Sequence, residues 1–313
     1  MEHRMKRSII VILVLVTLAM AAGVLVHTGQ SPEAGRMAGV DTGTVTYKRI
    51  VSMAPNITET LFALGLGERV AGVTRFCVYP PEARKKRKVG GFLDPNYEAI
   101  VVLEPDLVLL LPEQERVREY LTELGLYYEV VHNRTVSEIL ATITTVGSLC
   151  RVETRAQELV EDIKKWMDSI RNRNIDALRP RVLITVGRTM GSGSLRDVCI
   201  TGGNTFYDEL IACAGGENAY DGAKIAYPVV SAEGILHMNP EIIIELLPNI
   251  KETGLDETDI LKDWESLPDI DAVKSGRVFI VQSDYSVVPG PRFILFLEDL
   301  ARMIHPETLP GKP

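Results

Sequence analysis

The sequence predicts an α/β protein whose two Rossmann-like lobes hold mainly parallel sheets and are joined by one long rigid helix. Three observations lead to this fold class. One sequence pattern occurs twice, at residues 98–110 and 233–245. Short apolar runs typical of buried strands alternate with helical stretches, as they do in parallel sheets with crossover helices. The chain has 313 residues, which suits two lobes better than a single core.

The repeated pattern predicts the same local structure in each lobe. A glutamate stands seven residues before a proline that precedes an acid and an aliphatic run. Asn96 and Ser231, two positions before the glutamates, can cap a short helix, so Glu98 and Glu233 fall in its first turn, where the helix dipole favours an anion. The proline ends the helix, and the aliphatic run predicts a buried strand. We therefore expect one acidic helix tip in each lobe.

The remaining elements follow from apolar spacing and from turn residues. In the first lobe we expect strands at residues 48–53, 70–73, 107–111 and 128–131, and helices at 54–64, 112–124 and 136–150. In the second lobe we expect strands at 181–186, 198–201, 242–244 and 278–281, and helices at 205–212 and 293–304. The glycine-rich stretch 187–193 lacks the Gly-Lys-Ser/Thr ending of a phosphate-binding loop, which argues against nucleotide binding.

Residues 154–175 predict the connector between the lobes. This stretch contains no proline or glycine, and Leu159, Ile163, Trp166 and Ile170 recur at helical spacing. A helix of this length spans roughly 30 Å. Because such a helix is stiff, we expect limited rocking of the lobes and not a wide hinge closure.

The domain organisation begins with a targeting segment. Arg4, Lys6 and Arg7 precede an apolar run at residues 9–26, which predicts either a cleaved signal peptide or a retained membrane anchor. Either exports the rest of the chain, and no cysteine follows that could carry a lipid. The expected divisions are a signal or anchor at 1–27, a flexible tether at 28–46, an N-terminal lobe at 47–152, an interdomain helix at 153–178 and a C-terminal lobe at 179–313.

Composition excludes several classes of function. The formal net charge of −8 argues against nucleic acid as a partner. The five histidines are scattered and the four cysteines lack zinc spacing, so we expect no bound metal ion and no intrinsic cofactor. No Gly-x-Ser-x-Gly motif is present, and an enzyme is disfavoured. Cys199 and Cys213 form a disulfide or remain buried thiols; both alternatives are open.

Several motifs together resemble one class of transport protein. They are Ser-Met-Ala-Pro-Asn-Ile-Thr-Glu at 52–59, Tyr-Pro-Pro at 79–81, Val-Gly-Gly at 89–91, Ala-Gly-Gly-Glu-Asn at 214–218 and the two repeated segments. The chain resembles, over about residues 48–304, the class III substrate-binding proteins of ABC importers for cobalamin, iron-siderophores and haem. The resemblance implies an extracytoplasmic binding protein that captures a metal chelate between its lobes.

The resemblance also implies partners and site residues. In that class the first-turn glutamates, here Glu98 and Glu233, dock on the transmembrane permease dimer, which works with ATPase subunits. Phe92 and Tyr227 occupy the positions at which cobalamin binders carry aromatic residues. The expected ligand-binding residues are Pro55, Asn56, Phe76, Tyr79, Gly91 and Phe92 in the first lobe, and Arg188, Met190, Tyr227, Asp284, Tyr285 and Arg292 in the second.

These residues narrow the possible classes of ligand but do not identify one. A corrinoid would use the aromatic walls, whereas an anionic iron-siderophore would use Arg75, Arg188 or Arg292 as donors. Haem is less favoured, because Gly91-Phe92 stands where haem binders of the class carry a tyrosine. A membrane-tethered sensor on the same fold is the alternative to a transport function.

Overall fold

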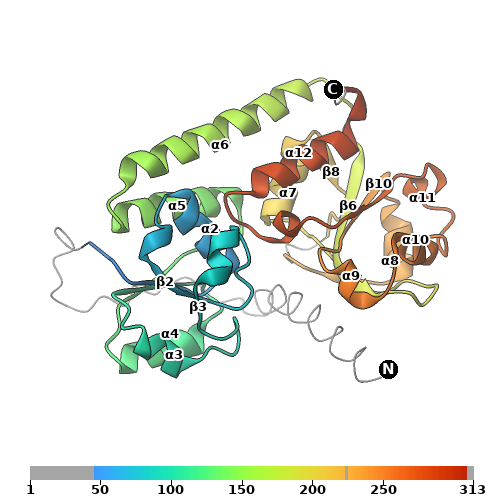
Figure 1. Ribbon diagram of the computed structural model, residues 1–313. Coiled ribbons are helices and arrows are strands. Elements are labelled where there is room, and N and C mark those ends of the chain that lie inside the picture. Colours follow the sequence, from blue (N-terminus) through green and yellow to red (C-terminus); the bar gives the residue numbers. More distant parts are fainter. Residues whose placement is uncertain (1–45, 223–224, 309–313) are drawn as a thin grey trace. The chain divides into compact units, whose positions relative to one another are not determined.

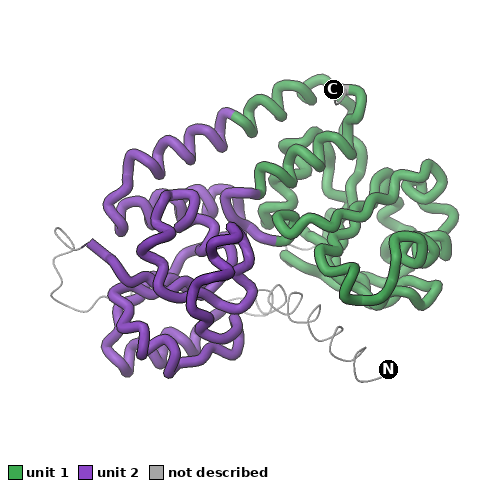
Figure 2. The backbone as a smooth tube through the Cα atoms, viewed as in Figure 1, with its two compact units in different colours: residues 1–26, 166–287, 293–313 green, residues 27–165, 288–292 purple. Residues whose placement is uncertain are grey.

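The computed structural model describes residues 46–222 and 225–308, and the predicted signal or anchor segment lies outside them. This part of the chain forms two compact units, coloured in Figure 2. The N-terminal unit contains residues 46–165 and also Val288–Arg292, and the C-terminal unit contains Trp166–Val287 and the chain from Phe293. None of the helices within the described residues is both long and apolar enough to span a bilayer.

The N-terminal unit is built on a five-stranded sheet in which every strand pair is parallel. The strand order is β3-β2-β1-β4-β5, so the chain first moves outward from β1 on one side and then returns to the other. The position between β1 and β4 is therefore the topological switch point of the sheet. The strands are β1 (Ile50–Ser52), β2 (Val70–Val73), β3 (Arg87–Lys88), β4 (Leu107–Leu110) and β5 (Tyr128–Val130).

Helices cover both faces of this sheet, with α2 and α5 on one face and α3 and α4 on the other (Figure 1). Val51 and Val108 of the central strands pack against Ile100 of α3 and Leu121 of α4, and all four side chains are buried. The helices are α2 (Pro55–Ala63), α3 (Tyr97–Val102), α4 (Glu115–Glu123) and α5 (Val136–Leu149), with 3-10 turns η2 (Gly67–Arg69) and η3 (Pro81–Lys85).

The long helix expected at 154–175 is α6 (Glu153–Arg173), and the division between the two units falls within it. Its buried positions include Ile163, Met167 and Ile170. Trp166 does not belong to the buried stripe, because its side chain is 49% exposed. The helical spacing is as expected, but the buried residue at this turn is Met167 and not Trp166.

The C-terminal unit contains a mixed sheet of order β11-β10-β6-β7-β9, with β8 also paired to β6. Strand β7 runs antiparallel to β6 and β9, so this sheet is less uniformly parallel than the sequence suggested. Since β7 and β8 lie on one side of β6 and β10 on the other, its switch point is between β6 and β10. The strands are β6 (Arg181–Thr189), β7 (Arg196–Ile200), β8 (Glu217–Asn218), β9 (Val229–Val230), β10 (Ile242–Leu246) and β11 (Val278–Val281).

The helices of this unit also form two layers, with α7 and α12 on one side of the sheet and α8, α10 and α11 on the other (Figure 1). Trp264 at the end of α10 is buried against Leu183 and Ile243 of the central strands. The helices are α7 (Phe206–Cys213), α8 (Ala232–Met238), α9 (Ile250–Thr253), α10 (Glu257–Trp264), α11 (Asp271–Lys274) and α12 (Phe293–Ile304), with 3-10 turns η4 (Asp284–Val287) and η5 (Pro306–Thr308).

The cysteines are all buried free thiols, so the alternative of a Cys199–Cys213 disulfide is not realised. Cys199 lies in β7, where burial raises the pKa of its thiol to about 11. The thiol of Cys213, in α7, donates to the carbonyl of Met167 at 3.5 Å. Both thiols therefore have surroundings that favour the protonated, unreactive form.

The two copies of the sequence repeat have matching backbones. The residue before each proline, Glu104 or Asn239, adopts a left-handed conformation with φ of 44° or 40°. The acid after each proline accepts hydrogen bonds from backbone N–H groups at the start of the neighbouring central strand. Asp106 binds the N–H of Arg49 at 2.9 Å, and Glu241 binds that of Arg181 at 2.9 Å. The spacing that the two copies share therefore places, in each unit, an acid that holds the start of the neighbouring strand by hydrogen bonds.

Candidate functional site

The candidate residues of the N-terminal unit lie in the segments that follow its parallel strands, on loops or, for Pro55 and Asn56, in the first turn of α2. Pro55 and Asn56 follow β1, Phe76 and Tyr79 follow β2, and the Gly91 loop follows β3. Because the strands are parallel, these loops lie at one edge of the sheet, the edge at which open α/β sheets bind ligands.

One side chain closes the switch point of this sheet. Gln114, which precedes α4, is buried and donates from its Nε2 to the carbonyls of Met53 at 3.3 Å and Phe92 at 3.1 Å. Its Oε1 accepts from the N–H of Leu111 at 3.0 Å. The loops after β1, β3 and β4 are therefore tied together by a single uncharged amide, whose partners satisfy both of its ends.

A second cluster joins Arg292 to the same unit. Its guanidinium donates to both carboxylate oxygens of Glu59 in α2, at 3.0 and 2.5 Å. The guanidinium also lies over the ring of Tyr79, 3.6 Å from the centroid. Glu59 is buried and Tyr79 is 41% exposed. The guanidinium of Arg292 thus contacts a carboxylate and an aromatic ring, and these contacts restrict the positions of the Glu59 and Tyr79 side chains.

Gly91 lies next to a third cluster, which contains Arg75, Phe76 and Asp94. Arg75 forms an exposed ion pair with Asp94 at 2.6 Å and lies over the ring of Phe76 at 5.2 Å. A Cβ on Gly91 would lie 2.1 Å from an oxygen of Asp94, so a larger residue there would displace the Arg75–Asp94 pair. Phe92 itself is buried in the core, and the neighbouring Leu93 is the exposed residue at 56%. The aromatic wall expected at Phe92 is therefore not exposed in this structure.

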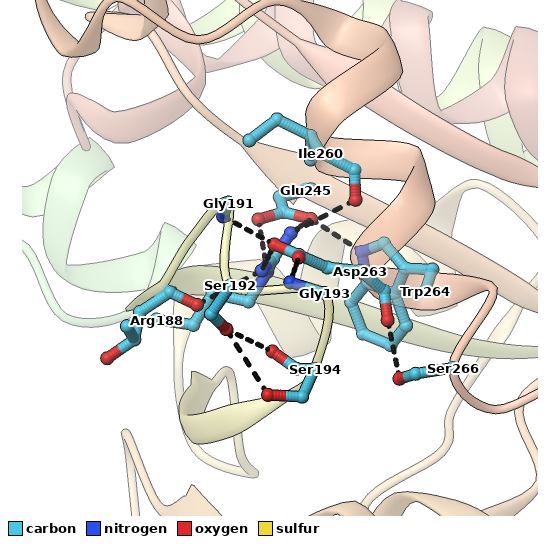
Figure 3. A network of polar contacts seen from close by, with 11 residues as sticks. Arg188, Gly191, Ser192, Gly193, Ser194, Glu245, Ile260, Asp263, Trp264 and Ser266 are labelled. Carbon is cyan, nitrogen blue, oxygen red and sulfur yellow. Dashed lines mark hydrogen bonds and ion pairs between the residues drawn. The ribbon is translucent and has the colours of Figure 1, made fainter.

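In the C-terminal unit the expected ligand donor Arg188 is fully buried in a network of charges (Figure 3). Its guanidinium donates to Glu245 of β10 at 2.8 Å and to Asp263 of α10 at 2.5 Å. The indole N–H of Trp264 donates to Glu245 at 2.6 Å. We name the residues Arg188, Glu245, Asp263 and Trp264 the charged network. It lies at the carboxyl ends of β6 and β10, which form the switch point of this sheet.

The two carboxyl groups of the charged network differ in acidity. Burial raises the pKa of Glu245 above its ordinary value, although Arg188 and Trp264 act in the opposite direction. Burial also acts to raise the pKa of Asp263, but hydrogen bonds from Arg188 and from the N–H groups of Gly191 and Gly193 outweigh it and lower that pKa. Asp263 is therefore the more firmly ionised partner of the single arginine.

The other candidates of this unit are partly buried. Met190 packs beside the cluster of Leu247, Ile250 and Ile260. Asp284 and Tyr285 form η4 after β11, and the Tyr285 hydroxyl donates to Asp299 at 2.8 Å. Arg188, Met190, Asp284 and Tyr285 thus share one edge of the sheet.

Tyr227 lies elsewhere along the sheet, next to the end of β7. The carbonyls of its neighbours Ala226 and Pro228 accept hydrogen bonds from Gly202 and Ile200. Ile200 in turn pairs with Thr185 of β6. The backbone of Tyr227 therefore lies beyond β7, on the side away from β6.

Comparison with known proteins identifies the family. Residues 50–285 match the family described as periplasmic binding protein. The chain belongs to the periplasmic binding protein family. Members of this family bind solutes for transport and are not enzymes.

Named relatives agree with this assignment. An uncharacterized ABC transporter substrate-binding lipoprotein, YvrC, of Bacillus subtilis (strain 168) is 30% identical over 83% of this chain and 81% of its own. A vitamin B12-binding protein of Vibrio vulnificus (strain YJ016) is 25% identical over 81% of this chain and 88% of its own. The crystal structure of a possible iron-binding (periplasmic solute-binding) protein from Staphylococcus epidermidis ATCC 12228 superposes with a TM-score of 0.71 and 28% identity, covering 83% of this chain and all of that one.

This periplasmic binding protein has one exposed glutamate in the first turn of α3 and one in that of α8. The side chain of Asn96 accepts from the N–H of Ala99, and that of Ser231 accepts from the N–H of Gly234, as the sequence predicted. Both Glu98 and Glu233 are exposed. Hydrogen bonds from its own backbone N–H and from Ser231 lower the pKa of Glu233. That carboxylate is therefore ionised at neutral pH.

Each unit also contains buried residues that the sequence did not single out as functional, namely Glu59 and Gln114 in the N-terminal unit and Glu245 and Asp263 in the C-terminal unit. Each acts through a partner distant in sequence, so no local pattern marks it. Among the described residues, no three His, Cys, Asp or Glu side chains gather in a way that would hold a metal ion.

Proposed function

We propose that this protein captures a metal chelate outside the cytoplasm, with a corrinoid as the favoured ligand, and delivers it to an ABC importer. The ligand contacts lie where the chain leaves the carboxyl ends of the strands in each sheet, and they include Asn56, Tyr79 and Met190. The partner is a permease dimer with its ATPase subunits. The N-terminal segment directs export and leaves the protein secreted or anchored at the membrane.

The observation that carries this proposal is the matched pair of exposed glutamates. Each unit contains a side-chain cap, a first-turn glutamate and an acid after the proline that accepts from the neighbouring strand, with Asn96 and Asp106 in one unit and Ser231 and Glu241 in the other. Local helix capping alone explains one such glutamate. Its exact repetition in two units favours a partner with two-fold symmetry, such as a permease dimer with one cationic site on each subunit.

The state of the arginines supports a ligand without strong negative charge. Arg75, Arg188 and Arg292 are the donors that an anionic iron-siderophore would use, and each is paired with a carboxylate of the protein. Recruiting one of them would take the cation away from that carboxylate, which is costly for the buried Glu59 and Glu245. A corrinoid that is recognised through rings and neutral hydrogen bonds avoids this cost. The vitamin B12-binding relative is consistent with this choice.

Uptake into vesicles containing the cognate importer tests the docking assignment. We expect the double variant Glu98→Ala and Glu233→Ala to bind cyanocobalamin as the wild type does but to lose most of the import, because binding and docking use different surfaces. Glu158→Ala, an exposed glutamate of α6, is the matched control and should import normally. Import that persists in the double variant would reject docking through these residues, and a wild-type protein that supports no import would favour a tethered sensor.

The visible absorbance of protein purified from its native host tests the ligand. Corrinoids, ferric siderophores and haem absorb at distinct wavelengths, so one spectrum separates the three. Corrinoid bands are the expected result. Haem bands or a ferric siderophore band would retain the transport function and replace the ligand.

A further inference from the structure

We propose that Asp263 is a positioning residue that sets the conformation of residues 190–194, the glycine loop, for contact with the ligand. The inference rests on the proposed function, in which Met190 of this loop is a ligand contact. The loop connects β6 to β7 and contains Met190, Gly191, Ser192, Gly193 and Ser194.

The geometry ties two turns of the loop to one carboxylate. Oδ2 of Asp263 accepts from the N–H of Gly191 at 2.7 Å, and Oδ1 accepts from the N–H of Gly193 at 2.6 Å. Both glycines have positive φ, at 70° and 68°. This backbone conformation is readily adopted by glycine alone, and it directs both N–H groups inward to the same side chain.

The carboxylate is itself held in place by the charged network (Figure 3). Arg188 donates to Asp263 at 2.5 Å while it also donates to Glu245 and to the carbonyl of Ile260. The side chains of Arg188 and Asp263 are almost completely buried. Because a buried charge that loses its partner is strongly destabilising, Asp263 is confined to one orientation, and the loop is confined with it.

The outward face of the glycine loop is uncharged. Gly191, Ser192 and Gly193 are exposed, and an added Cβ on Gly193 would meet no atom within 4 Å. The Ser192 hydroxyl donates to the carbonyl of Ser194 at 2.9 Å. Because Asp263 already occupies the two inward N–H groups, the loop does not offer them to a phosphate. The groups that remain available to a ligand are the exposed backbone and the serine hydroxyls, which suit the amide-bearing edge of a neutral chelate.

Asp263→Asn tests the inference while Glu245 still neutralises Arg188. The readouts are amide hydrogen exchange in residues 190–194 and the affinity for cyanocobalamin. We expect faster exchange in the glycine loop and roughly tenfold weaker binding, since a charge-assisted acceptor of two N–H groups is lost. Asp208→Asn, in which a partly buried acceptor of Asn218 in the same unit is altered, is the control and should change neither readout.

Gly193→Ala provides an independent variant if Asp263→Asn does not fold. It leaves the charged network intact but disfavours the positive φ, and we expect about fivefold weaker binding with unchanged Trp264 fluorescence. Cyanocobalamin affinity that is unaltered in both variants overturns the inference, as does unaltered loop exchange in Asp263→Asn. A wild-type protein that binds none of cyanocobalamin, a ferric trihydroxamate and haem rejects the proposed function itself, and the inference fails with it.

Discussion

The two units close their switch points with different chemistry. Between β1 and β4, the uncharged Gln114 bonds to three backbone groups. Between β6 and β10, Arg188 is shared by Glu245 and Asp263, and the indole of Trp264 completes the set. Both arrangements fix loops that leave the carboxyl ends of central strands. The same architectural task is thus performed once by a neutral amide and once by buried charges.

The difference predicts unequal tolerance to substitution. An amide that bonds to backbone groups costs little to bury, and its loss leaves neutral groups unsatisfied. A buried ion pair stabilises weakly as a whole, but removal of one member leaves an uncompensated charge. The C-terminal unit should therefore be the more sensitive of the two to single substitutions and to pH.

Arg188→Met should have the largest effect. It leaves the carboxylates of Glu245 and Asp263 buried without their cation, and we expect a loss of about 3–5 kcal/mol in the free energy of unfolding. Urea denaturation followed by Trp264 fluorescence measures it, in a Trp166→Phe background that removes the second tryptophan.

Arg171→Met is the control for that variant. Arg171 pairs with Asp168 on the exposed surface of α6, and such pairs contribute at most about 1 kcal/mol. If Arg188→Met costs no more than Arg171→Met, the charged network is not a tightly coupled unit and the comparison between the switch points fails.

Gln114→Glu should have the next largest effect. The new carboxylate keeps its bond from Leu111 but faces the carbonyls of Met53 and Phe92 without a donor, at an expected cost of about 1–3 kcal/mol at neutral pH. The cost should shrink in acid, because a protonated carboxyl donates again. Denaturant unfolding monitored by far-ultraviolet circular dichroism measures both values.

Gln157→Glu makes the same chemical change at an exposed position of α6, where the side chain donates to Glu161 at 3.0 Å. It should alter stability by less than about 0.5 kcal/mol. Equal costs for Gln114→Glu and Gln157→Glu would show that Gln114 does not hold the three loops together.

The sequence correctly predicted the features that depend on residues close together in the chain. The exposed positions of Glu98 and Glu233, their caps and the following strands all depend on residues within a dozen positions, and the structure contains each of them. Arg188 was predicted as a ligand contact, and its protein partners could not be foreseen, because Glu245 and Asp263 lie 57 and 75 residues away. Spacing also could not decide between Phe92 and Leu93, since adjacent loop residues exchange sides with a small change in backbone angle.

The pH dependence of the charged network should be the smallest effect and the most specific one. The pKa of Glu245 is raised in the folded state, so its contribution to stability is fully present below the unfolded-state value and is lost as pH rises through the folded-state value. The pKa of Asp263 is lowered, so its contribution is present above the unfolded-state value and is lost as pH falls through the folded-state value.

Glu245→Gln isolates the first of these two titrations. The free energy of unfolding of the wild type minus that of Glu245→Gln should decrease as pH rises from about 4 toward neutrality, because only the wild type must ionise a carboxyl that prefers its proton. Gln114→Met, which removes an uncharged group from the other switch point, should show a difference from the wild type that does not vary over the same range. A pH-independent difference for Glu245→Gln would mean that Arg188 compensates its burial fully, and the two switch points would then respond alike to acid.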